Sequence, residues 1–467
     1  MKALASWAVL SALALGGLAF VLFGKTNARQ VFLPGKTSDG HYQIESACES
    51  CHGDPFAPAS SLQSACERCH GHELEAAHDS HPLAKFSDPR NAQRTKQLDA
   101  RRCVTCHREH WPEGTSSMGL TLPADYCHQC HSDVGRVRKS HANLDFSSCA
   151  STGCHRFHDN RATYEDALVA HAGEPDLLAN AVLPAITASA TTPTPVPSSD
   201  APSSDAAASD AAASEPRASV ATALPPLSAA ERDAPLGHAL PDAELEAWAA
   251  SAHARARVNC NGCHAPSGAW TNSVSFEACG ACHASEKAGW MSGRHGMRAG
   301  LGLPAMTTEL SRTPMQPGAP HEALSCNSCH SAHGFDRQTA AVRACQGCHG
   351  DAHSQAYAGS PHARAWAAEQ NGSAPAGSGV SCATCHLPRV HTEDGRARAQ
   401  HNQNDNLRPR DKMIRSVCEN CHGLRFSIDA LADPRLVENN FSAPPHAHIP
   451  SIDWALARAQ TPRSTRP

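Results

Sequence analysis

The hydrophobic pattern of the chain is uneven, and its longest apolar run lies at the N-terminus. Ala3 to Phe23 contains no charged side chain, and Lys2 precedes it. A run of this length predicts a helix that can span a bilayer. We therefore expect residues 1–30 to be a membrane anchor. A signal peptide cleaved near the small residues at 26–28 is the alternative.

Two later stretches show the clearest helical pattern. They are Asp242 to Arg257 and Ser427 to Val437. Pro434 is expected to interrupt the second one, because proline lacks the backbone N–H that an interior helical position donates.

Composition divides the remaining chain into parts. Residues 179–235 are built mainly of Ala, Ser, Pro, Thr and Asp, which predicts a disordered linker. It separates two modules, at 31–178 and 236–441, that we expect to fold separately with few contacts between them. The segment 442–467 is rich in Pro and Arg, which predicts a flexible tail.

The overall composition restricts what can fill the interior. Only 40% of the 467 residues are hydrophobic and 5% are aromatic, which is little for a chain of two or three domains. The net charge of −5 argues against a nucleic-acid-binding protein, which normally carries a basic excess. The unusual counts are 22 Cys and 31 His, so the chemistry of these two residue types decides the class of protein.

Twenty of the cysteines form ten C-x-x-C pairs, and His follows every pair. With 31 His in 467 residues, chance would place one there about once in fifteen cases. C-x-x-C-H is the attachment motif of c-type haem, in which the thiols bond covalently to the porphyrin and the His binds iron. The ten pairs are Cys48/Cys51, Cys66/Cys69, Cys103/Cys106, Cys127/Cys130, Cys260/Cys263, Cys279/Cys282, Cys326/Cys329, Cys345/Cys348, Cys382/Cys385 and Cys418/Cys421.

The remaining two cysteines form a longer version of the same motif. Cys149 and Cys154 are separated by four residues, and His155 follows. We interpret this as an eleventh attachment site, so the cofactor prediction is eleven covalently attached haem c groups. A disulfide or two free thiols is the alternative for this pair. Zinc ribbons also use paired C-x-x-C units, but they do not need a His after every second Cys.

Each half of the chain holds enough histidines to give every iron two ligands. Eleven motif histidines are the predicted first ligands: His52, His70, His107, His131, His155, His264, His283, His330, His349, His386 and His422. Twenty others remain, nine for five haems in the first half and eleven for six in the second. Two neutral imidazoles close the coordination sphere of an iron, which then exchanges electrons without an open position for substrate.

Spacing selects four of the twenty as predicted second ligands. His41 and His253 each precede the first Cys of a motif by seven residues. In the second half an aromatic residue precedes a His by five positions three times, at His253, His295 and His362. A Ser lies two or three residues before each of these three. The repeat predicts a short helix that presents a ligand.

Closely spaced motifs also bear on the fold class. Cys48 to Cys66 is 18 residues, and Cys260 to Cys279 is 19. Such spacing holds neighbouring porphyrins close together, and close porphyrins exchange electrons quickly. Around them we expect a mainly α fold of two haem-packed modules, with short helices, much irregular chain, almost no sheet and the N-terminal helix or signal.

The density of these motifs makes residues 31–178 resemble the multihaem cytochromes of the class III type. The second half resembles the superfamily of hydroxylamine oxidoreductase and pentahaem nitrite reductase, through Trp290 to Gly296, Ser381 to Pro388 and Val417 to His422. Two departures weaken the case for that chemistry. No site ends in Lys, as the catalytic site of those nitrite reductases does, and no Tyr follows the last motif to crosslink a catalytic haem.

Two functions follow from these observations. The first is electron transfer in a periplasmic respiratory chain, and the absence of a Lys-ligated site favours it. The alternative is an oxidoreductase that acts on a small nitrogen or sulfur compound at one open-faced haem. The expected partners are a membrane quinol-oxidising module or a periplasmic donor, a reductase and the cytoplasmic membrane, with no nucleic acid. Haem attachment and the N-terminal run together predict the periplasmic side of a bacterial cytoplasmic membrane, with the chain anchored there by its N-terminal helix.

Overall fold

The N-terminal helix and the haem-motif regions are the main described parts of the chain. The computed structural model describes residues 2–23, 33–53, 60–77, 81–115, 119–138, 141–142, 146, 149, 156–159, 165–179, 181–183, 225–238, 240–334, 336, 338–391, 396–407 and 411–460. Most of the predicted linker, the 26–28 segment, Cys154 and His155 therefore lie outside the described residues.

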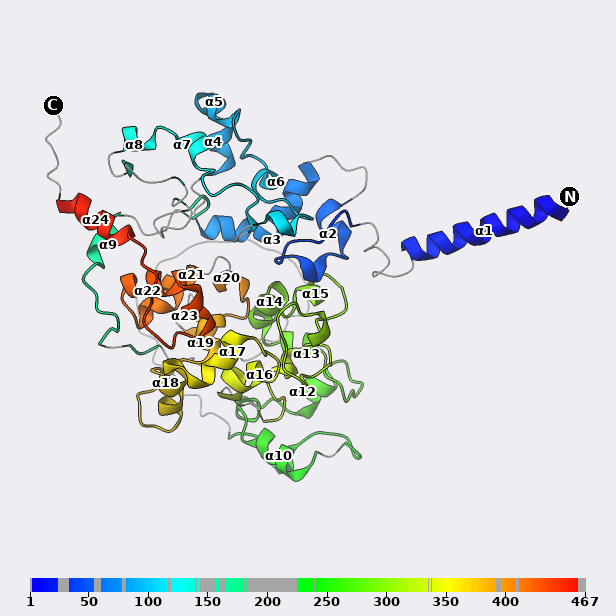
Figure 1. The fold of residues 1–467 in the computed structure, drawn as a ribbon. Coiled ribbons are helices and arrows are strands. Elements are labelled where there is room, and N and C mark those ends of the chain that lie inside the picture. Colours follow the sequence, from blue (N-terminus) through cyan, green and yellow to red (C-terminus); the bar gives the residue numbers. More distant parts are fainter. Residues whose placement is uncertain are drawn as a thin grey trace, which may run out of the picture.

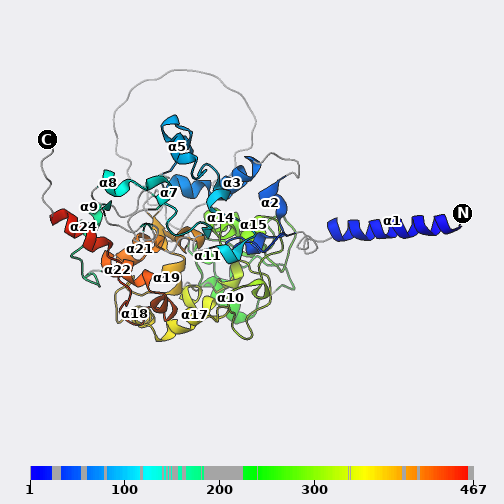
Figure 2. The same cartoon turned by 45° about the horizontal axis from the view of Figure 1, so that its top comes forward.

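Helix α1 (Lys2–Phe23) stands apart from the rest of the described chain (Figures 1 and 2). Its apolar side chains, among them Trp7, Leu13 and Phe20, are exposed. None of the helices in the described ranges is long and apolar enough to cross a membrane. The role of residues 1–30 as anchor or signal stays a prediction.

The first module consists of short helices joined by irregular chain. Its α-helices are α2 (Cys48–His52), α3 (Ser60–Ala76), α4 (Leu83–Ser87), α5 (Ala92–Thr95), α6 (Cys103–Cys106), α7 (His128–His131), α8 (Val134–Val137) and α9 (Glu165–Ala170). Its 3-10 turns are η2 (Tyr42–Ile44), η3 (Pro89–Asn91) and η4 (Pro112–Gly114).

The second module has the same character and adds one small sheet. Its helices begin with α10 (Asp242–Ala249), α11 (Ala252–Arg255), α12 (Cys260–His264), α13 (Phe276–Gly280), α14 (Ala284–Ser292), α15 (Met297–Gly300), α16 (Ala344–Gln346), α17 (Ala352–Ala356) and α18 (Pro361–Gln370). They continue with α19 (Cys382–His386), α20 (Asn404–Leu407), α21 (Lys412–Ser416), α22 (Leu424–Ala432), α23 (Pro434–Glu438) and α24 (Ser451–Gln460). The turns are η8 (Ala229–Glu231), η9 (Thr308–Leu310), η10 (Cys326–Ser328), the π-helical η11 (Thr339–Arg343), η12 (Tyr357–Gly359) and η13 (Cys418–Asn420).

The predicted fold class is confirmed. Strands β1 (Arg389–His391) and β2 (Ala397–Ala399) pair antiparallel, with Arg389 opposite Ala399, and they form the only sheet among the described residues. Both predicted stretches are mainly helical, but each is divided, the first at Ser251, which caps α11. The second is divided before Pro434, which occupies the first turn of α23, where its missing N–H is not needed.

The largest apolar cluster joins segments that are far apart in the sequence. Leu168 of α9 packs with Ile414 of α21, with Leu424 and Ile428 of α22 and with Ile452 of α24. Leu168 and Ile452 are each 1% exposed and Leu424 is fully buried. Helices α9 and α24 lie side by side (Figures 1 and 2). A part of the first module therefore completes the core of the second.

Helix α24 departs from the prediction of a flexible tail after residue 442. Pro-rich sequence at 444–450 suggests a tail, but the following segment carries Ile452, Ala455 and Leu456 at helical spacing. This apolar stripe buries against the cluster around Leu168, and full burial of a side chain as large as Ile452 contributes about 1.5–3 kcal/mol.

The two modules also meet through charged groups, so the expectation of few contacts between them is wrong. The Arg294 Nη1 donates to the Asp39 carbonyl at 2.6 Å, and Arg298 donates to the Gln43 carbonyl. The Arg312 guanidinium pairs with Asp39 at 2.8 Å and lies 4.4 Å from the Tyr42 ring centroid. Composition did not reveal this interface, because it uses isolated charges that pair only after folding.

Candidate haem centres

Several haem-attachment motifs form one short helical turn. Helices α2, α12 and α19 each cover a whole C-x-x-C-H motif. Residues three apart lie on one face of a helix, so the turn brings the two thiols of a motif to the same side. The turns at Cys260 and Cys382 are capped, since the side chains of Asn259 and Ser381 accept hydrogen bonds from backbone N–H groups.

Ten of the eleven motif histidines face a histidine from outside the motifs. The ring centroids of the ten pairs are 5.9–6.5 Å apart. A metal–imidazole bond is about 2.0 Å long and the nitrogen lies about 1.2 Å from its ring centroid, so two imidazoles on opposite sides of one metal ion have centroids about 6.4 Å apart. The residues thus fit an iron bound between each pair.

We number the sites in the chain order of their motifs. In the first module the pairs are His52–His110 (site 1), His70–His41 (site 2), His107–His158 (site 3) and His131–His81 (site 4). In the second they are His264–His333 (site 6), His283–His253 (site 7), His330–His401 (site 8), His349–His295 (site 9), His386–His353 (site 10) and His422–His362 (site 11). Site 5 is the Cys149/Cys154 motif, whose His155 lies outside the described residues.

Hydrogen bonds orient many of the paired rings through Nδ1. The Nδ1 atoms of seven rings lie within hydrogen-bonding distance of a backbone carbonyl, for example His264 to Thr271 at 2.7 Å and His422 to Asp176 at 2.7 Å. The other five are His81, His107, His110, His353 and His401. Donation from Nδ1 fixes the tautomer and leaves Nε2 to bind a metal, as in other metal-ligating histidines.

Burial keeps several of these rings neutral. Burial, assisted by the neighbouring His349, lowers the pKa of His295 to about 4. Burial likewise lowers the pKa of His386 and of His362 to about 4, in each case with a facing His as a further cause. Neutral imidazole is the form that binds iron, so these positions are prepared for coordination at physiological pH.

The structure places all four histidines that spacing selected opposite a motif histidine. His41 faces His70, His253 faces His283, His295 faces His349 and His362 faces His422.

The aromatic residues of the repeat are buried in the protein. Trp248, Trp290 and Tyr357 are 5–9% exposed. Ser251 and Ser360 cap α11 and α18 by accepting the N–H groups of Ala254 and Ala363. In these two copies the Ser therefore begins the helix that presents the His.

Six facing histidines were among the twenty candidates but carried no selected spacing. They are His81, His110, His158, His333, His353 and His401. For four of the six, the sequence does contain a recurring spacing after a motif His. His110, His158 and His333 follow a motif His by three residues, and His353 follows one by four. Such a His faces the motif of another site, so its partner could be found only from the folded chain.

Thiols of successive motifs lie close together. The side chains of Cys66 and Cys103 are hydrogen-bonded, and so are those of Cys127 and Cys149. In the second module the same contact joins Cys279 with Cys326 and Cys345 with Cys382. Attachment points of neighbouring sites are thus in contact, which places the sites in series along each module.

The two modules repeat one pairing scheme. At sites 1 and 6 the facing His lies three residues after the motif His of the second site further along the chain, which is site 3 or site 8. At sites 2 and 7 the facing His lies seven residues before the first Cys of the preceding motif. At sites 4 and 9 the facing His lies 11 and 12 residues, respectively, after the motif His of site 2 and of site 7. The thiol contacts recur at equivalent motifs too. Sites 3 and 8 differ, since His158 follows a motif His by three residues and His401 follows one by 15. The spacings shared by the other site pairs indicate that sites 1–5 and 6–10 form a duplicated unit, with site 11 in addition.

Two predicted attachment thiols, Cys69 and Cys282, lie on the protein surface. Both residues are exposed, as are Cys51 and Cys329, whereas the other described motif cysteines are partly buried. Cys69 and Cys282 are the second thiols of the equivalent sites 2 and 7, so both copies of the duplicated unit turn the same thiol outward. A thioether bond holds a haem without burial of its sulfur, so their role in attachment stays a prediction.

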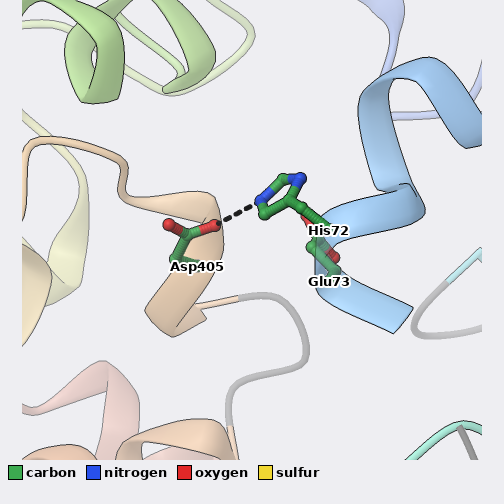
Figure 3. A group of neighbouring side chains, drawn as sticks. All are labelled: His72, Glu73 and Asp405. Carbon is green, nitrogen blue, oxygen red and sulfur yellow. Dashed lines mark ion pairs between the residues drawn. The ribbon is translucent and has the colours of Figure 1, made fainter. Parts of the chain in front are cut away.

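Another group of possible metal ligands lies at the contact between the modules. Ligand atoms of His72, Glu73 and Asp405 lie within 4.8 Å of one another, and His72 Nε2 is 3.6 Å from Asp405 Oδ1 (Figure 3). The Lys412 Nζ is 3.7 Å from a Glu73 oxygen, and Asn402 donates to Asp405. Because these partners already balance the carboxylates, we interpret the group as an ion-pair contact between α3 and α20.

Comparison with known proteins supports the nature of the first module. Residues 40–132 match the family model described as cytochrome c3. This match supports a multihaem c-type cytochrome with covalently bound haem c that takes part in electron transfer. No curated protein and no solved structure matches the chain. The resemblance of the second half to the hydroxylamine oxidoreductase superfamily is not supported.

Proposed function

We propose that the chain is an eleven-haem c-type cytochrome that transfers electrons between partner proteins and has no open site for a small substrate. The observation that carries this proposal is the set of ten facing histidine pairs, each with one motif His. When bound, haem supplies the one-electron chemistry, and two imidazole ligands leave its iron no free position.

The residues of the chain attach, orient and space the haems. The thiols fix each position covalently, and the Nδ1 hydrogen bonds hold ligand rings such as His107 and His264 in place. Thiol contacts such as that of Cys345 with Cys382 support short distances between successive sites. The charged interface between the modules then joins the two series of haem sites in one body. This arrangement suits electron transfer between a donor at one end and an acceptor at another.

The duplicated unit provides a second ligand for site 5. In the second module, His386 of site 10 faces His353, which lies between motifs 9 and 10. In the corresponding interval between His131 and Cys149, His141 is the only His. Cys149 also contacts Cys127 as Cys382 contacts Cys345. We assign His141 as the partner of His155 on this equivalence.

The location and partners belong to the same proposal. Covalent haem attachment and the apolar N-terminal sequence support a protein on the periplasmic side of a bacterial cytoplasmic membrane. There it would accept electrons from a membrane quinol-oxidising module or a periplasmic donor and deliver them to a reductase.

Electron paramagnetic resonance of the oxidised protein tests the closed coordination. We expect only low-spin ferric haem in the wild type. His141→Ala is expected to add one high-spin haem while all eleven remain attached, because the thioether bonds do not involve this ring. His321→Ala, which changes an exposed ring paired with Glu309, is the control and should leave the spectrum unchanged.

Two outcomes would contradict this account. A high-spin haem in the wild type would favour the enzyme alternative, since it indicates an iron with an open position. An unchanged spectrum in His141→Ala would show that His141 is not a ligand.

A further inference from the structure

At site 2 the ring that faces the motif His is held by a carboxylate instead of a carbonyl. At site 2, the Nδ1 of His41 lies 2.6 Å from Glu109 Oε1. The closest comparable contacts are weaker: His333 Nδ1 is 3.3 Å from the exposed Glu244, and His70 Nδ1 is 3.6 Å from Glu73. Site 2 therefore has the shortest contact between a carboxylate and a facing ring among the described sites.

The position of Glu109 is fixed by its other contacts. Ser38 donates to it twice, from its backbone N–H and from its hydroxyl, both at 2.9 Å. Glu109 also precedes His110, whose ring faces His52 at site 1. The close approach of Gly35 to the His110 carbonyl leaves no room for a Cβ at Gly35, and His110 has a φ of 60°. The loop that carries Glu109 is thus held by Ser38 near site 2 and by the packing of Gly35 on His110 near site 1.

Site 7 is the counterpart of site 2 in the duplicated unit, so the surroundings of their ligand rings can be compared. Site 7 pairs His253 with His283 by the same scheme as site 2. The residue before His333, which corresponds to Glu109 before His110, is Ala332. Within the described parts of the chain, no hydrogen-bond partner reaches the His253 ring. At the ring that faces the motif His, site 2 therefore has a carboxylate partner that site 7 lacks among the described residues.

We propose that Glu109 is a positioning residue that lowers the reduction potential of the site 2 haem below that of the equivalent site 7 haem. The inference rests on the proposed function. A carboxylate that accepts the Nδ1 proton of a ligand raises the basicity of that ligand, and its negative charge favours the ferric state. Hydrogen bonding to the axial ligand is one of the means by which a protein tunes haem potential.

Glu109→Gln in the full-length haem protein is the direct test. The amide oxygen can still accept from His41 and from the Ser38 hydroxyl, while the amide NH2 replaces the oxygen that accepts the Ser38 backbone N–H. The variant therefore keeps the contact with the ligand ring and loses the charge and one hydrogen bond. We expect one component of the redox titration to move to higher potential and one low-spin species to change its g-values. Ala332→Glu should move a different component to lower potential.

Glu113→Gln is the matched control, because Glu113 lies in η4 four residues beyond Glu109 and carries the same charge. It should leave the titration unchanged. If Glu109→Gln has no more effect than this control, the tuning role is overturned. The haem content of each variant, measured by mass, keeps the two hypotheses apart, since loss of the proposed function would appear as missing haems in the wild type.

Discussion

Replacement of His253, His295 or His362 with Met is expected to raise the potential of one haem in each variant without detaching it. Each ring faces a motif histidine at 6.1–6.2 Å and makes no covalent contribution to haem attachment. A Met/His-ligated iron has a higher potential than an iron with two His ligands. The shift should be on the order of 0.1 V, within the roughly 0.8 V that axial ligands cover.

Redox titration of the full-length protein measures this effect. One titrating component should move upward in each single variant, and different components should move in the three variants. His321→Met is the control, because this exposed ring pairs with Glu309 and faces no motif histidine. Changing Trp248 or Trp290 to Phe should have a smaller effect, through packing alone. Unchanged titration curves for all three His variants would mean that the aromatic–His repeat is a packing motif.

Leu168→Ala is expected to destabilise the contact between the modules by about 2–5 kcal/mol, the usual cost of a large-to-small change at a fully packed site. Leu168 is 1% exposed and comes from the first module, yet its neighbours in the cluster come from α21, α22 and α24. The loss should therefore appear as earlier release of α9 from α24 and from the rest of the second module.

Denaturant unfolding with limited proteolysis can measure this loss. The variant should show a lower unfolding midpoint and faster cleavage near α24. Leu177→Ala, at a position 63% exposed in the same segment, is the control and should change stability by less than about 0.5 kcal/mol. Equal behaviour of the two variants would show that the modules do not depend on this core.

The attachment chemistry could be predicted from the sequence because it is local. Two thiols and a His within five residues define a candidate site whatever the rest of the chain does, as at Cys260 to His264. The choice of second ligand is not local. His110 follows one motif and faces another, and only the folded chain brings it to His52. The spacing rule found His41 and His253 because those two are equivalent positions of the duplicated unit.

The contact between the modules could not be predicted for a different reason. Helix α9 has only six residues, and the apolar stripe of α24 does not say which distant segment will cover it. Their apolar side chains become a core only when Leu168 and Ile452 meet across most of the sequence. The Arg312 contacts with Asp39 and Tyr42 likewise join residues with no local relationship.

The mass of the intact mature chain tests the central claim most directly. The account predicts the polypeptide plus eleven covalently attached haems, one for each motif including Cys149/Cys154. Ten haems would mean that the long-spaced Cys149/Cys154 motif carries no haem, while the ten C-x-x-C-H motifs all do. Eight or fewer would contradict the account, because at least two of the C-x-x-C-H motifs would then carry no haem.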